Sequence, residues 1–201
     1  MRGLLIDYGG VLTTNVFDSF REFCDAQGLD RDAVKRLFRE EPRTLVLVRG
    51  LETGELTRED FEQGFGELLG IEDREGLVDR MFAGVRPDEA MQAVLRRARA
   101  AGIRTGLISN SMGDTVYDRS TFAELFDGVV ISGEVGLHKP QPEIFLLGAE
   151  RAGVEPAECV FVDDLRENCE GAEAVGMTAI LHRGADRTVP ELERLLGVEL
   201  G

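Results

Sequence analysis

The sequence predicts an α/β fold in which a doubly wound parallel sheet is interrupted by an all-helical insertion. Three observations lead to this prediction. The chain begins with a short apolar run, residues 4–6, which ends in Asp7 and is soon followed by a pair of glycines. Residues 15–85 carry apolar side chains at helical spacing. From residue 86 onward, strand-like and helix-like stretches alternate, which is typical of parallel strands joined by right-handed crossovers.

The first strand needs partners, because so short an apolar run cannot bury itself within a bundle of helices. We therefore expect it to join the sheet that the C-terminal part of the chain builds. This places an α/β core domain at residues 1–14 and 86–201 and a helical domain at residues 15–85. The two linkers are expected near residues 13–15 and 84–87.

The insertion reads as helical throughout, with one exception. Phe17 and Phe20 recur at helical spacing, and Thr57 is a predicted N-cap because Asp60 lies three residues later. Only residues 44–48 resemble a strand. An acidic run is expected to form a solvated helix face, and its members are Glu52, Glu55, Glu59 and Asp60.

The C-terminal part reads as the rest of a Rossmann-like sheet with its crossover helices. Strands are expected at residues 103–109, 128–132, 159–164 and 178–182. A helix within residues 86–101 is closed by Gly102. Further helices are expected at residues 114–125, 142–152, 166–175 and 188–196.

Composition excludes several classes of partner. The 201 residues, 43% of them hydrophobic, suffice for one sizeable core with a small second unit. A net charge of −15 repels nucleic acid and anionic lipid, so we expect neither as a partner. The sequence has no apolar stretch of membrane length and no basic-then-apolar leader, and its three cysteines show no paired metal spacing. We therefore expect a reduced, cytoplasmic chain.

Polar side chains stand where the predicted strands end. In open α/β sheets, ligands bind beyond the carboxyl ends of the strands. One further charged residue, Lys139, lies in "GLHKPQPEIF", just before the helix that leads into the strand at residues 159–164. The fold would bring these residues to one edge of the sheet: Asp7, Ser109, Asn110, Lys139, Asp163 and Asp164.

The charges at this edge predict a site for Mg²⁺ and a phosphoryl group. Three clustered carboxylates raise each other's pKa unless a cation compensates them, and Mg²⁺ takes oxygen ligands while often keeping a substrate phosphate in its shell. Lys139 adds a point charge. The hydroxyl of Ser109 and the backbone N–H groups after Asp7, such as that of Gly10, are donors for the oxygens of an anion. A carboxylate beside the metal can attack the phosphoryl group and form a covalent aspartyl intermediate.

Four segments of the chain together resemble the four motifs of the haloacid dehalogenase-like hydrolase superfamily. They are "IDYGGVLT", "LISNS", "HKPQPEIF" and "VFVDDLREN", and their order and spacing also match. "RGLETGELTREDF" resembles the helical cap of the small-cap subgroup, so the resemblance covers essentially the whole chain. The chain looks similar to glucose-1-phosphatase-like members and to the phosphatase domain of soluble epoxide hydrolases. The resemblance implies a Mg²⁺-dependent phosphohydrolase of a small phosphorylated metabolite, with residues 15–85 as its cap domain.

The resemblance also implies a role for each site residue. Asp7 is similar to the nucleophile, and Ser109 and Lys139 are similar to the residues that hold the phosphoryl oxygens. Asn110 and Asn168 would orient these groups, and Asn110 would also contact the substrate. The metal would be held by Asp7, the backbone carbonyl of Gly9, Asp163 and Asp164.

Gly9 departs from the pattern of the superfamily. Most of its phosphatases carry a second aspartate at this position, which protonates the leaving group and then activates water. Gly9 has no side chain and cannot transfer a proton. Some members with glycine there resemble active phosphatases, so the change does not by itself imply inactivity. The leaving-group preference and the turnover rate are the properties that this change affects.

Three alternatives share part of this pattern. A 2-haloacid dehalogenase uses a similar nucleophile without metal, but two extra carboxylates at residues 163–164 would then oppose an anionic substrate. A receiver-type signalling domain also combines an acidic pair with Lys-Pro, although there the acidic pair comes early in the chain. A relative of the phosphatases that kept the fold for a binding role is the third alternative.

Overall fold

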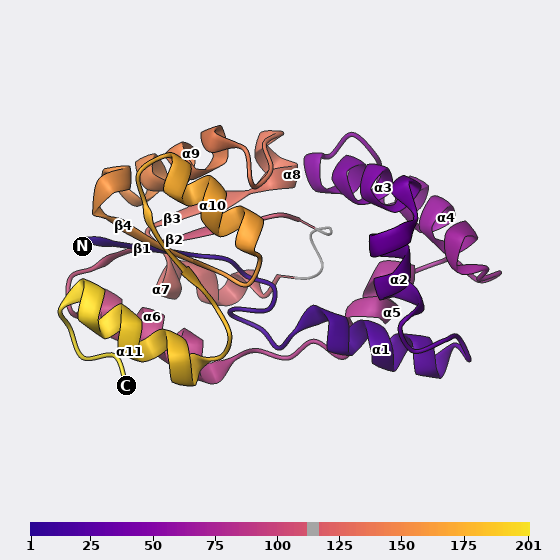
Figure 1. Cartoon of the computed structure of the whole chain (residues 1–201), viewed down its shortest axis with the longest axis horizontal. Coiled ribbons are helices and arrows are strands. Elements are labelled where there is room, and N and C mark those ends of the chain that lie inside the picture. Colours follow the sequence, from indigo (N-terminus) through magenta and orange to yellow (C-terminus); the bar gives the residue numbers. More distant parts are fainter. Residues whose placement is uncertain (112–116) are drawn as a thin grey trace.

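The parallel sheet of the computed structural model, which describes residues 1–111 and 117–201, has five strands in the order β3-β2-β1-β4-β5 (Figure 1). The strands are β1 (Gly3–Ile6), β2 (Arg104–Ser109), β3 (Gly128–Ile131), β4 (Cys159–Asp163) and β5 (Thr178–Leu181). The first strand lies at the centre, where Ile6 is in register with Leu107 of β2 and Val162 of β4. The predicted α/β fold with a doubly wound parallel sheet is confirmed.

Helices cover both faces of the sheet (Figure 1). One layer contains α6 (Glu89–Ala100), α7 (Phe122–Leu125) and α11 (Ala185–Leu196), and the other contains α9 (Pro142–Ala152) and α10 (Arg166–Ala174). Successive residues of β1 serve the two layers in turn, because Leu4 packs with the first and Leu5 with the second. Short elements complete the core: 3₁₀ turns at Arg119–Thr121 and Pro156–Glu158, and α8 (Ser132–Val135).

The segment between β1 and α6 forms a bundle of helices with its own hydrophobic cluster. The helices are α1 (Val16–Ala26), α2 (Ala33–Glu40), α3 (Pro42–Thr53), α4 (Arg58–Leu69) and α5 (Leu77–Phe82). Phe61 and Phe65 of α4 stack in this cluster and are fully buried. The predicted N-cap is confirmed, since the backbone N–H of Asp60 donates to Thr57 Oγ1 over 3.1 Å.

The strand considered for residues 44–48 is wrong, because α3 runs through them. Pro42 stands at the start of this helix, where its missing N–H costs nothing, and the Glu41 side chain accepts from the N–H of Arg43. Thr44 and Val48, four residues apart, lie on the buried side of the helix. Burial in this segment therefore follows a helical period rather than an alternating one, and Val46 between the two buried residues is exposed.

Two other predicted boundaries differ from the structure. The helix expected over residues 114–125 is shorter: residues 114–116 lie outside the described residues, and the Asp118 side chain starts a short 3₁₀ turn by accepting from the N–H of Ser120 over 3.1 Å. The last helix begins at Ala185 rather than at residue 188. An earlier turn closes because the N–H of Thr188 donates to the Gly184 carbonyl over 3.1 Å, so Pro190 lies inside the helix.

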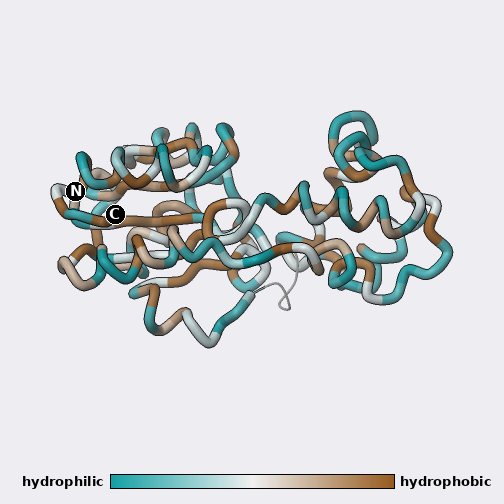
Figure 2. The backbone as a smooth tube through the Cα atoms, turned by 90° about the horizontal axis from the view of Figure 1, so that it is seen from below, coloured by the Kyte–Doolittle hydropathy of each residue, from teal (hydrophilic) through white to brown (hydrophobic). Residues whose placement is uncertain are grey.

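The helical bundle and the α/β core are joined by two adjacent stretches of chain. Thr13 and Pro87 form an antiparallel bridge, and the N–H of Thr14 donates to the Arg86 carbonyl over 2.8 Å. Figure 2 shows apolar strands between more hydrophilic helices in the core, with the bundle to one side. No helix within residues 1–111 and 117–201 is long and apolar enough to cross a membrane.

Candidate active site

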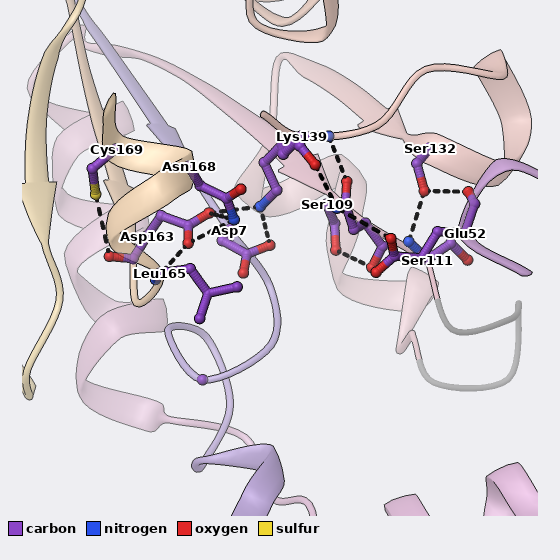
Figure 3. Close-up of polar contacts among 12 residues, drawn as sticks. Asp7, Glu52, Ser109, Ser111, Ser132, Lys139, Asp163, Leu165, Asn168 and Cys169 are labelled. Atoms are coloured by element: carbon purple, nitrogen blue, oxygen red, sulfur yellow. Dashed lines mark hydrogen bonds and ion pairs between the residues drawn. The ribbon is translucent and has the colours of Figure 1, made fainter. Parts of the chain in front are cut away.

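A buried lysine joins two carboxylates at the carboxyl end of the sheet (Figure 3). Asp7 follows β1, Asp163 ends β4, and Lys139 comes from the loop between α8 and α9. The Lys139 ammonium lies 2.7 Å from Asp7 Oδ1 and 2.7 Å from Asp163 Oδ2. Lys139 is only 3% exposed and Asp163 is fully buried, so little water screens these pairs. The sheet thus brings together three residues that are far apart in sequence.

The electrostatics of this cluster leave an excess of negative charge. Burial raises the pKa of Asp7 to about 7, and although Lys139 lowers it, Asp163 and Asp164 raise it further. Burial and Asp163 likewise raise the pKa of Asp164 to about 6. Burial alone would lower the pKa of Lys139, but Asp163 and Asp7 raise it above its ordinary value. One lysine therefore does not compensate the three carboxylates.

The three carboxylates fit a divalent cation. Asp7, Asp163 and Asp164 each offer an oxygen, and these atoms lie within 4.8 Å of one another. Gly10 makes room for this arrangement, because a Cβ there would stand 2.6 Å from Asp164 Oδ2, and its φ of +74° also favours glycine. An all-oxygen donor set of this kind suits Mg²⁺.

Neighbouring groups hold Asp163 in one orientation. Its Oδ1 accepts from the N–H of Leu165 over 2.8 Å and from Asn168 Nδ2 over 3.0 Å. Its Oδ2 accepts from Lys139 and, over 3.1 Å, from the same Asn168 amide. Asn168, which was expected to orient the site, thus contacts the buried carboxylate, whereas Asp164 remains partly exposed.

Ser109 and Asn110 lie beside the lysine at the end of β2, but their contacts differ. The Tyr117 hydroxyl donates to Ser109 Oγ over 3.0 Å. Asn110 holds the main chain of Lys139: its Oδ1 accepts from the Lys139 N–H over 2.8 Å, and its Nδ2 donates to the Lys139 carbonyl over 3.1 Å. Asn110 therefore positions the lysine. A lone tyrosine carries no sequence signal, so Tyr117 was missed.

The glycine turn after β1 is used differently from the expectation. The N–H of Gly10 donates to Thr13 Oγ1 over 3.1 Å, within the turn itself, rather than standing free for a substrate. Gly9 has space around it, because a Cβ there would meet Val16 Cγ1 at an ordinary 3.5 Å. The two glycines thus bring no side chain to the site, and Gly10 leaves space for the Asp164 carboxylate.

Glu52 lies near the site, although the sequence analysis assigned it to a solvated helix face. It belongs to α3, and its carbonyl accepts from Ser132 Oγ over 2.5 Å (Figure 3). Its carboxylate Oε2 accepts from Asn110 Nδ2 at 3.5 Å, a long contact. The expected solvated face is therefore wrong for Glu52, which is half-buried where α3 packs on α8, whereas Glu55 is exposed. Burial raises the pKa of Glu52 to about 7.

Comparisons with known proteins agree with this geometry. Residues 1–176 match the family described as haloacid dehalogenase-like hydrolase. The chain is 33% identical over 55% of its length to bifunctional epoxide hydrolase 2 of Sus scrofa, but spans only 21% of that protein. It is 28% identical to the fructose-1-phosphate phosphatase YqaB of Escherichia coli (strain K12), covering 89% of this chain and 94% of the relative.

A solved structure also has the same fold. The HAD family enzyme bt-2542 of Bacteroides thetaiotaomicron, in complex with magnesium and inorganic phosphate, superposes with a TM-score of 0.67. The two chains are 22% identical, and the match covers 91% of this chain and 94% of the other. This likeness shows the shared fold, and the family match over residues 1–176 shows that the chain belongs to the haloacid dehalogenase-like hydrolases.

Proposed function

We propose that this chain is a Mg²⁺-dependent phosphohydrolase of a small phosphorylated metabolite and that Asp7 is its nucleophile. The observation that carries the proposal is the cluster at the sheet edge: Lys139 bridges Asp7 and Asp163, and Asp164 lies close by. A phosphatase among the relatives and a magnesium and phosphate complex among the structural neighbours support it.

The proposed reaction uses the residues at the ends of the strands. Asp7 attacks the phosphorus atom, and Lys139 favours the ionised form of the attacking carboxylate by lowering its pKa, and orients it. Lys139 and Ser109 hold phosphoryl oxygens, which fixes the substrate in line with Asp7. Asp7, Asp164, Asp163 and the Gly9 carbonyl would hold Mg²⁺, which when bound would neutralise charge on the phosphoryl oxygens.

The helices of residues 15–85 are proposed as a cap over this site. Their contact with the core at Glu52 and Ser132 places α3 beside the end of β2. Closure of a cap would exclude water while the phosphoryl group is transferred to Asp7. Side chains of the cap would then contact the part of the substrate that differs from one metabolite to another.

A screen of phosphorylated metabolites, with Mg²⁺ and with excess chelator, tests this function. Phosphate release that requires Mg²⁺ is expected. Gly10→Ala should weaken Mg²⁺ binding by about 10–100-fold, because its Cβ would crowd Asp164. Gly28→Ala is the matched control, since Gly28 has a similar positive φ but nothing within 4 Å of its Cβ. Full activity in chelator, or chloride release from chloroacetate in its place, would contradict the proposal.

A further inference from the structure

The proposed reaction lacks a proton donor for the leaving group at position 9, where glycine has no side chain. An alkoxide is a poor leaving group, so a positioned acid is needed when the substrate is an alkyl phosphate. Asp7 is occupied as the nucleophile. Asp163 is saturated by its four contacts, and the pKa of Lys139 is raised, so the lysine retains its proton. Asp164 is a proposed ligand of Mg²⁺, so the donor is expected from another part of the molecule.

We propose that Glu52, which α3 carries to the end of β2, donates this proton and later accepts one from the attacking water. The inference rests on the proposed phosphohydrolase function. The side chain of Asn110 links α3 to the cluster at the sheet edge, because its amide contacts the Glu52 carboxylate and also binds the main chain of Lys139. Lys139 in turn contacts Asp7. Glu52 thus stands a short chain of contacts away from the nucleophile.

The main chain of Glu52 is anchored to the core. Ser132 Oγ donates to the Glu52 carbonyl and accepts from the N–H of Ser111 over 2.8 Å, so α3 is tied to the start of α8 and to the segment that follows β2. Gly54 ends the helix directly afterwards with a φ of +76°. These contacts use the backbone of Glu52, whereas its carboxyl group makes the long 3.5 Å contact with Asn110 Nδ2, which a substrate could replace.

The surroundings of Glu52 suit a group that both gives and takes a proton. Burial is the main cause of its raised pKa, Lys139 and Arg49 lower it, and Asp7 and Glu167 raise it. With a pKa of about 7, the carboxyl group is partly protonated at neutral pH, which is where an acid–base catalyst is most effective. A neutral carboxyl group also approaches an anionic phosphate without charge repulsion.

The two chemical steps balance with Glu52 in this role. In the first, the bond from Asp7 to phosphorus forms, the bond from phosphorus to the leaving oxygen breaks, and the Glu52 proton moves to that oxygen to give an alcohol. In the second, water attacks phosphorus, the bond to Asp7 breaks, and the water proton moves to Glu52. Inorganic phosphate leaves, and both carboxyl groups return to their starting states.

Glu52→Gln tests the inference on an alkyl and an aryl phosphate. We expect phosphate release from the alkyl ester to fall by about 10²–10⁴-fold. The leaving group of an aryl phosphate needs no acid, so transfer of its phosphoryl group to Asp7 should still be fast and give a rapid burst. The later turnovers should become slow, because hydrolysis of the phosphoryl group on Asp7 lacks the base. The fall in alkyl turnover above about pH 7 should also disappear in this variant. Glu55→Gln, at an exposed position near the end of the same helix, should leave both substrates unchanged.

A second variant separates chemistry from structure. Gly9→Asp has room at its Cβ, so adding it to Glu52→Gln should restore part of the alkyl turnover. A merely structural role for Glu52 predicts no such rescue. An unchanged ratio of alkyl to aryl turnover in Glu52→Gln, with the pH profile retained, overturns the inference and leaves the phosphohydrolase function standing. No phosphate release from either ester by the unaltered chain overturns both.

Discussion

Lys139 shows how much of the site depends on one side chain. It is buried, and its ammonium pairs with two carboxylates at 2.7 Å each. The Asn110 side chain binds both the N–H and the carbonyl of its main chain. A charge of this kind is tolerated inside a protein because its partners are also charged and fixed. Removing it leaves those partners buried without a cation.

We predict that Lys139→Met lowers the free energy of unfolding by about 3–5 kcal/mol in chelator, at about pH 8. Lys139 lowers the pKa of Asp7, so this pKa rises further in the variant. The native state then binds protons more readily than the unfolded chain, and part of the lost stability returns as the pH falls to about 5. Urea unfolding at both pH values measures this. Lys35→Met, at an exposed position, is the control, and a loss below about 1 kcal/mol would show that the pairs behave as surface pairs.

At the scale of elements, the sequence predicted the sheet well because buried strands and their polar ends carry a local signal. Asp7 was found this way because it directly follows β1, and Ser109 and Asp163 because they end β2 and β4. Glu52 was not, because its burial arises from the packing of α3 on α8, two elements far apart in sequence. The residues of α3 that resembled a strand were misread because β-branched side chains are also compatible with a half-buried helix.

The bundle of helices contains a buried carboxylate of its own. Glu62 of α4 is 6% exposed and accepts from the N–H groups of Gly76 and Val78 over 3.0 and 3.1 Å, at the start of α5. Arg58 Nε donates to the same carboxylate over 3.0 Å. Glu62 thus supplies the acceptor that the first turn of α5 lacks within the helix.

Glu62→Ala should therefore destabilise the bundle by about 1–3 kcal/mol, because the backbone donors lose their charged acceptor. Urea unfolding measures the change. Because the chain has no tryptophan, the unfolding is followed by far-ultraviolet circular dichroism. Glu59→Ala, one turn away at an exposed position, should change stability by less than about 0.5 kcal/mol. If Glu62→Ala changes the free energy of unfolding as little as Glu59→Ala does, the Glu62 contacts contribute nothing to stability.

For the whole molecule, the strand order decides which residues meet. With β1 between β2 and β4, the ends of the three strands that carry Asp7, Ser109 and Asp163 are neighbours. The loop before α9 adds Lys139, and the helical bundle adds Glu52 from the other side (Figure 3). The strand pattern in the sequence predicted that the residues of the core would meet. The contribution of the bundle depends on how it docks, which local patterns do not encode.

The most direct test of this account is to trap the phosphoryl group on Asp7. The unaltered chain is mixed with an aryl phosphate and Mg²⁺, quenched with acid during the first turnover, and mapped by peptide mass spectrometry. We predict a phosphoryl group on the peptide that contains Asp7, and neither this adduct nor phosphate release in Asp7→Asn. Phosphate release that continues in Asp7→Asn, or a phosphoryl group found on another residue, would contradict the assignment of Asp7 as the nucleophile.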